Sequence, residues 1–186
     1  MNQPFRHETE RLILRDWRDE DWKPFWDATN TPAVMRWLGG VLNGAGMDGA
    51  RQRLESYIRD FGHTFWAVER KSDQAILGFC GLKRCNQRGG PIGMMEVGWR
   101  LREDAWGQGY AKEAAIASID LAFDRFAADE VIALTVQRNE ASWGLMKRLG
   151  MKRREDLDFD NGDFDPENPR IVVWSIDETE WRALDD

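Results

Sequence analysis

The chain has 186 residues and a formal net charge of −7, with 42% hydrophobic and 32% charged residues. This length suits one core, so we expect residues 1–186 to form a single domain. The negative charge argues against nucleic acid as the main partner and favours a cationic substrate such as an amine. No apolar stretch approaches the ~20 residues of a membrane span, and the first residues contain no apolar signal-peptide core. We therefore expect a cytoplasmic protein without a membrane partner.

The first elements are a short strand and two helices. The alternation in Arg11–Arg15 predicts a strand. Asp19 is placed to cap a helix over about Glu20–Ala28. The pair Thr31–Pro32, a cap followed by proline, predicts a short helix that ends near Leu38.

The middle of the chain predicts a helix and then an antiparallel meander. A glycine-containing loop, Gly39–Gly49, leads into a helix over about Asp48–Phe61. Three strands should follow, at Thr64–Glu69, Ala75–Lys83 and Met94–Leu101, joined by polar turns. Three consecutive strands joined by hairpin turns exclude a doubly wound parallel sheet.

The last part of the chain returns to alternating helices and strands. Apolar residues at helical spacing predict a helix over Ala111–Phe126, and β-branched residues predict a buried strand at Glu130–Gln137. A shorter helix is expected at about Glu140–Leu149. Two final strands are expected near Lys152–Leu157 and Arg170–Asp177.

The segment Trp106–Lys112 reads WGQGYAK and lies between a strand and a helix. Gly107 and Gly109 allow a tight turn that exposes backbone N–H groups. The helix start adds unpaired N–H groups and the positive end of its dipole. This combination predicts a phosphate or pyrophosphate cradle. Lys112 stands where a dinucleotide fingerprint needs its third glycine, which disfavours that class.

Four segments of the chain resemble the GNAT superfamily of acetyl-CoA-dependent N-acetyltransferases, in particular the branch of the ribosomal-protein acetyltransferases RimJ and RimL. They read TERLILRD (Thr9–Asp16), EVGWRL (Glu96–Leu101), WGQGYA (Trp106–Ala111) and NEASWGLMKRLGM (Asn139–Met151). Gly109 and Ala111 match the superfamily signature [QR]-x-x-G-x-[GA]. Trp106 replaces its first residue, and an aromatic residue there is similar to the RimJ/RimL branch.

The resemblance implies an α/β fold of the α+β type. Its sheet is strongly twisted, mixed and mostly antiparallel, flanked by helices, with the fourth and fifth strands splayed apart. The freed edge of Met94–Leu101 would pair with pantetheine as another strand would. The cofactor-binding residues implied are Trp99, Arg100, Leu101, Trp106, Gly107, Gln108, Gly109, Tyr110, Ala111, Lys112 and Asn139. Lys112 would either add charge near a phosphate or be a solvated first-turn lysine.

The reaction that the resemblance implies is acetyl transfer from acetyl-CoA to a primary amine, on a small molecule or a protein N-terminus. A backbone N–H around Trp99–Leu101 would stabilise the oxyanion. Glu96, a lone carboxylate in an apolar strand, is the candidate base. It could instead form an ion pair with Arg100, or an ordered water chain could carry the proton.

The candidate acid is Ser142, on the first turn of the helix that follows Asn139. Many superfamily members use a tyrosine in this helix, and Met146 occupies its position here. The serine hydroxyl could alternatively bond to its own backbone. The missing tyrosine leaves open a second class of function, a non-catalytic module that binds or senses acyl-CoA. The chain could be a monomer or a homodimer.

No metal site is expected. Cys80 and Cys85 match no redox or zinc spacing, and the chain has only two histidines. The acidic segment Asp156–Glu167 partly follows the spacing of a calcium loop, but Asn161 replaces the required glycine. We favour an exposed loop whose carboxylates attract a cationic amine, with simple solvation as the alternative.

Overall fold

The computed structural model describes residues 3–184, which divide into two units. The first comprises Met1–Arg36, Gly40–Lys83 and Gly98–Ser118, and the second comprises Trp37–Gly39, Arg84–Val97 and Ile119–Asp186. Strand β5 (Met95–Leu101) and helix α4 (Tyr110–Asp124) contribute residues to both units. The strand order of the sheet is β1-β2-β3-β4-β5-β6-β9-β7, with β8 paired to β9.

The strands of the first unit form antiparallel ladders. They are β1 (Arg6–Glu8), β2 (Leu12–Arg15), β3 (Phe65–Arg70) and β4 (Ile76–Arg84). The hairpin of β3 and β4 was expected, whereas β1 was not. The short polar strand β1 is held by its pairing with β2 and by Phe5, whose ring stacks on Trp66 at 4.1 Å.

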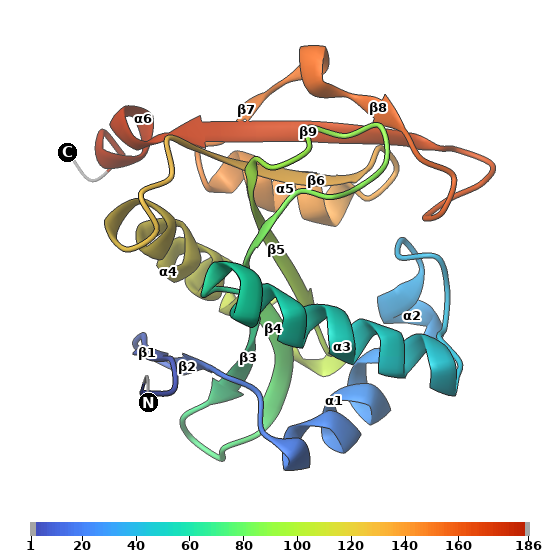
Figure 1. The fold of residues 1–186 in the computed structure, drawn as a ribbon, viewed down its shortest axis with the longest axis vertical. Coiled ribbons are helices and arrows are strands. Elements are labelled where there is room, and N and C mark those ends of the chain that lie inside the picture. Colours follow the sequence, from blue (N-terminus) through green and yellow to red (C-terminus); the bar gives the residue numbers. More distant parts are fainter. Residues whose placement is uncertain (1–2, 185–186) are drawn as a thin grey trace. The chain divides into compact units, whose positions relative to one another are not determined.

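The helices of the first unit cover one face of its strands (Figure 1). They are the 3-10 turn η1 (Asp19–Asp21), α1 (Trp22–Thr29), α2 (Pro32–Met35) and α3 (Gly44–Phe61). A cluster of buried residues from α1, α3 and β4 joins them, namely Trp22, Phe25, Leu54, Ile76 and Phe79. Helix α3 begins before the expected Asp48, because the Asn43 side chain accepts a hydrogen bond from the Gly46 N–H and caps the glycine-rich turn.

The second unit packs helices and short strands around two long strands. Strands β6 (Glu130–Val136) and β9 (Arg170–Asp177) form its longest ladder, and β9 also pairs with β7 (Lys152–Arg153) and β8 (Phe159–Asp160). Helix α5 (Glu140–Arg148) follows β6, as expected. The core of the second unit joins β6 and β9 through the buried Ile132, Val136, Ile171 and Val173.

Two elements near the C-terminus differ from expectation. The strand expected over residues 152–157 ends at Arg153, and the 3-10 turn η3 (Glu155–Leu157) follows. Helix α6 (Glu178–Arg182) was missed, although a capping box starts it. Asp177 accepts from the Glu180 N–H at 2.8 Å, and Glu180 accepts from the Asp177 N–H at 3.3 Å.

The sheet is mixed and mostly antiparallel, which confirms the expected fold class. Its parallel pair is β5 with β6, where Met95 lies opposite Val131 and Glu96 lies opposite Ile132. The splay of these two strands beyond this pair stays a prediction of the resemblance. Within residues 3–184, no helix combines the length and the apolar character that crossing a membrane requires.

Candidate functional site

The turn before α4 has the backbone geometry of an anion cradle. The φ angle is +70° at Gly107 and +81° at Gly109, a conformation that favours glycine. Helix α4 begins directly afterwards, at Tyr110. In the part of the chain that the structure describes, no atom accepts a hydrogen bond from the backbone N–H groups of residues 107–112. These groups are free to bind an anion, and the helix dipole favours negative charge there.

A three-point clamp from the N-terminal segment holds this turn in place. Glu113, in the first turn of α4, accepts hydrogen bonds from the Thr9 hydroxyl at 2.6 Å and the Arg11 backbone N–H at 2.7 Å. The Arg11 Nε donates to its other oxygen at 2.7 Å. Arg11 also donates to the Gln108 carbonyl oxygen at 2.9 Å. The clamp engages a carbonyl and a carboxylate, so it leaves the N–H groups of the turn free.

The clamp also sets the charge state of Glu113. Burial alone would raise the pKa of this carboxyl, but the hydrogen bonds from Thr9 and Arg11 outweigh it and hold the pKa below its ordinary value. Glu113 is therefore ionised at neutral pH. Its negative charge in the first helical turn complements the helix dipole.

Two aromatic side chains fix the ends of the turn. The Trp106 indole N–H donates to the Leu101 carbonyl oxygen at 2.9 Å, while 47% of the residue stays exposed. Tyr110 is buried, and the Arg11 guanidinium lies 4.4 Å from its ring centroid. Both side chains thus have structural contacts, and the segment offers its backbone N–H groups to a ligand.

Strand β5 is more exposed in its second half than at its start. Its first residues are buried, whereas residues 98–100 are partly exposed. Strand β4 approaches β5 closely at Gly78. A Cβ atom at this glycine would lie 2.0 Å from the Arg100 carbonyl oxygen, so no larger residue fits there. Arg100 forms no ion pair within residues 3–184, so the proposed pair with Glu96 does not form.

Helix α5 presents the serine that the sequence singled out. The Asn139 Oδ1 caps the helix by accepting from the Ser142 N–H at 3.3 Å, and its Nδ2 donates to the Thr135 hydroxyl at 3.0 Å. Among the described residues the Ser142 hydroxyl has no hydrogen-bond partner, so it does not bond to its own backbone. Ser142 is partly exposed, which leaves this hydroxyl accessible.

The other two residues of interest in the second unit are buried. Glu96 is 5% exposed on β5, opposite Ile132. Met146, at the position of the superfamily tyrosine, is 1% exposed and part of the core. Met146 therefore packs and offers no acid.

Ion pairs neutralise part of the acidic segment. Four of its aspartates pair with arginines of the same unit: Asp156 with Arg154, Asp158 with Arg153, Asp160 with Arg170 and Asp165 with Arg138. Asp158 also accepts from the Val173 N–H at 3.0 Å, so it is a structural residue. The expectation that this loop attracts a cationic amine stays a prediction, which now depends on the exposed Asp163 and Glu167. Within the described part of the chain, no three side chains are grouped as a metal site would need.

Sequence reasoning missed the clamp on the cradle. Arg11 and Glu113 are 102 positions apart, and no local pattern links them. The available signal was a carboxylate in the first turn after WGQGYAK combined with the separately noted segment TERLILRD.

The fold is that of an acetyltransferase. The chain belongs to the GNAT family, since the model of the acetyltransferase (GNAT) domain matches residues 11–152.

Curated relatives and solved structures agree with this assignment. The chain is 28% identical to YkkB of Bacillus subtilis, covering 81% of this chain and 87% of that protein. It is 26% identical to the N-acetyltransferase YnaD of the same organism, covering 78% and 81%. The fold is similar to that of an acetyltransferase from Agrobacterium tumefaciens, with a TM-score of 0.81, 22% identity and coverage of 96% and 97%. It is also similar to the ribosomal-protein-S5-alanine acetyltransferase of Vibrio fischeri, with a TM-score of 0.72, 19% identity and coverage of 95% and 98%.

Proposed function

We propose that this protein transfers the acetyl group of acetyl-CoA directly to a primary amine, in the manner of the RimJ/RimL branch. The observation that carries the proposal is the row of free N–H groups at residues 107–112, held open by the Arg11–Glu113 clamp. These groups would bind the pyrophosphate of the cofactor. The edge of β5 along the partly exposed residues 98–100 would bind the pantetheine arm.

The chain offers a group for each proton that the reaction moves. The amine must lose a proton to attack the thioester carbon, and Glu96 is the candidate acceptor of that proton. The tetrahedral oxyanion would be stabilised by a backbone N–H of residues 99–101. When the carbon–sulfur bond breaks, the Ser142 hydroxyl would donate a hydrogen bond to the thiolate and relay a proton to it from solvent water, so that the serine ends the step protonated.

A second candidate function is a non-catalytic module that binds acyl-CoA. Many superfamily members use a tyrosine as the general acid, and the buried Met146 at that position cannot donate a proton. Thiol release from acetyl-CoA distinguishes the two functions. The purified protein is incubated with acetyl-CoA and polyamines, amino acids, aminoglycosides or N-terminal peptides. Release above background with at least one acceptor supports transfer. Binding of acetyl-CoA without release from any acceptor supports the sensing module.

The cradle itself is tested by Gly109→Asp, with Gly62→Asp as the matched control. Both glycines have positive φ, +81° and +74°, so both variants carry similar backbone strain. Gly62 ends α3, and only Gly109 lies in the cradle. At 100 times its Kd, acetyl-CoA should stabilise wild type and Gly62→Asp by ~2.7 kcal/mol, and Gly109→Asp much less. Equal stabilisation of both variants would refute the cradle.

A further inference from the structure

Arg100 on β5 has a buried nitrogen atom, Nε, without a hydrogen-bond partner within residues 3–184. Its contact in the structure is the Phe79 ring, whose centroid lies 4.9 Å from the guanidinium carbon. Buried polar groups in proteins nearly always have partners, and an uncompensated buried charge is strongly destabilising. Such a group in a native structure calls for a ligand.

The surroundings of Arg100 disfavour its positive charge. Burial, reinforced by the positive charge of Arg53 on α3, lowers the pKa of Arg100 to about 10. The guanidinium still remains charged at neutral pH. Among the described residues, Arg53 is the charged side chain whose field acts on it, and it is also a cation.

The site is open to a ligand and has an apolar floor. Residues 98–100 are partly exposed, although the strand is buried on both sides of them. Phe65 and Phe79 stack with ring centroids 5.0 Å apart, and a Cβ at Gly98 would lie 2.7 Å from Phe65. The face of β5 that carries Gly98 and Arg100 therefore lies over two aromatic rings.

This face is the one opposite the helix of the cradle. Phe79 belongs to the cluster with α1 and α3, whereas its neighbour Cys80 points to the other face and contacts Ser118 of α4 at 3.6 Å. Since Arg100 packs on Phe79, it lies on the face of α1 and α3. The phosphates of the cofactor have their own N–H groups at the start of α4. The partner of Arg100 is then a group on the other substrate.

We propose that Arg100 binds a carboxylate of the acceptor, so that the acceptor is a small amine that also carries a carboxylate. This proposal rests on the proposed function and adds the class of acceptor to it. A carboxylate suits the site because its two oxygens match the planar fork of a guanidinium. The aromatic floor would contact the carbon skeleton between the amine and the carboxylate.

The test compares amino acids with their carboxamides as acceptors. These pairs differ in the anion and keep the amine. We expect the wild-type kcat/KM to be at least about 10-fold higher for the carboxylate, because the amide leaves Arg100 unpaired. Arg100→Gln should remove this preference, and Arg100→Lys should keep part of it. The matched control is Arg59→Gln, on the same helix as Arg53 and 72% exposed, which should keep the full preference.

Each outcome decides the proposal. Arg100→Gln should melt no lower than wild type, because it removes an unpaired buried charge. A wild type without preference, or a preference that survives in Arg100→Gln, would overturn the proposal. Loss of acetyl-CoA affinity in Arg100→Gln would instead make Arg100 a ligand of the cofactor. If no acceptor is acetylated, the proposed function fails on its own. The Arg100 Nε–H resonance in 15N NMR then tests the site, since it should shift with the carboxylates and not with the amides.

Discussion

Replacing Glu113 with glutamine should loosen the cradle with little change of shape. The carboxylate accepts from Thr9 and from the Arg11 backbone through one oxygen, and from the Arg11 Nε through the other. An amide in the same place keeps one oxygen. Its NH2 group must then face a donor, either the Arg11 guanidinium or the pair formed by Thr9 and the Arg11 N–H.

The expected loss follows from this geometry. A hydrogen bond to a charged group contributes about 1.5–3 kcal/mol, but 41% of the Arg11 side chain is exposed, so water replaces part of the loss. We expect Glu113→Gln to unfold with a free energy about 1–2 kcal/mol below that of wild type at neutral pH.

The pH dependence gives this prediction a definite sign. The pKa of Glu113 is lowered in the folded protein, so its contribution is complete above the unfolded value, taken as 4.5, and is lost as the pH falls through the folded value. The glutamine variant cannot titrate at this position. The stability difference between wild type and variant should therefore be full at neutral pH and should shrink in acid.

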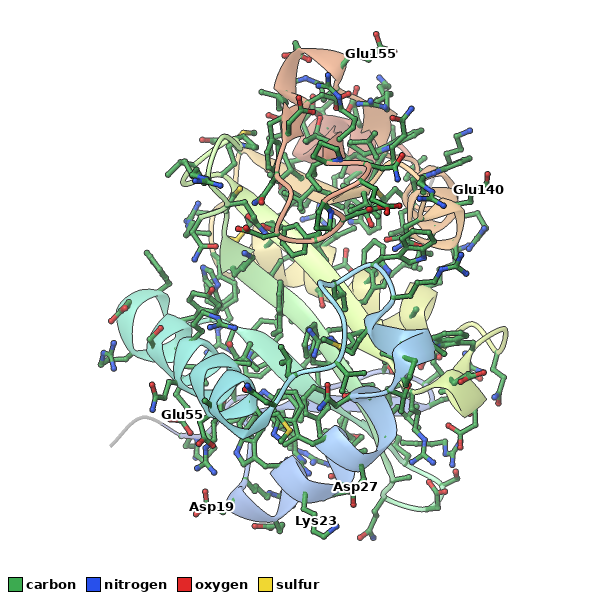
Figure 2. The ribbon with its side chains drawn as sticks, turned by 90° about the vertical axis from the view of Figure 1, so that its right-hand side faces the viewer. Asp19, Lys23, Asp27, Glu55, Glu140 and Glu155 are labelled. Carbon is green, nitrogen blue, oxygen red and sulfur yellow. The ribbon has the colours of Figure 1, made fainter. Side chains whose placement is uncertain are left out.

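The assay is urea unfolding at about pH 7 and in steps down to about pH 3.5. Asp27→Asn is the control, since Lys23 and Asp27 project from α1 as a pair with 84% and 64% of their side chains exposed (Figure 2). The control should change stability by less than about 0.5 kcal/mol at every pH. A Glu113→Gln loss that matches the control, or one that grows in acid, would refute the reasoning.

Three further outcomes are expected. Arg15→Met should lower the free energy of unfolding in urea by about 3–5 kcal/mol, because it leaves two buried carboxylates without their shared guanidinium; a loss under about 1 kcal/mol would contradict the network. Gly78→Ala should not fold stably, judged by circular dichroism, since its Cβ would lie 2.0 Å from a backbone oxygen of β5; a wild-type melting curve would disprove that close approach. Burial raises the pKa of the Cys80 thiol to about 12, so this thiol should react with alkylating reagents at pH 8 far more slowly in folded than in urea-unfolded protein, as read by peptide mass spectrometry. Equal rates would show that the thiol is accessible.

Local rules predicted the parts of the fold that are locally determined. The turn at WGQGYAK, the helix after it and the hairpin of β3 and β4 depend on glycine, capping and alternation within a few residues. The early start of α3 was not predicted, although the Asn43 cap that starts it is local. The distant support that Asn30 gives to this segment follows no local pattern. The Asn30 side chain holds both the N–H and the carbonyl of Leu42 and so orders the glycine-rich segment that follows.

The candidate site also has a part that the local sequence indicates and a part that depends on contacts between distant residues. The N–H groups of residues 107–112 belong to one short segment, so the sequence could indicate them. The residues that hold this segment could not be paired in advance, because Thr9 and Glu113 are 104 positions apart. Arg100 was singled out as a cofactor-binding residue and as a possible ion-pair partner of Glu96. Its packing on Phe79 was not predicted, because strand alternation alone does not give it.

The net charge of the chain predicted an acceptor attracted by its positive amine, whereas Arg100 points to an acceptor bound by its carboxylate. The two predictions differ because net charge and local charge act over different distances. Ions screen exposed charges beyond about 8 Å at physiological salt, so the total of −7 says little about a partly buried site. In the acidic segment each aspartate that pairs with an arginine forms a near-neutral pair, whose field falls off faster than that of a lone carboxylate. Arg100 has no such counter-charge, and its buried Nε is less screened than a surface group. The proposed selection of an acceptor amine by its carboxylate therefore depends on this local positive charge and not on the net charge of the chain.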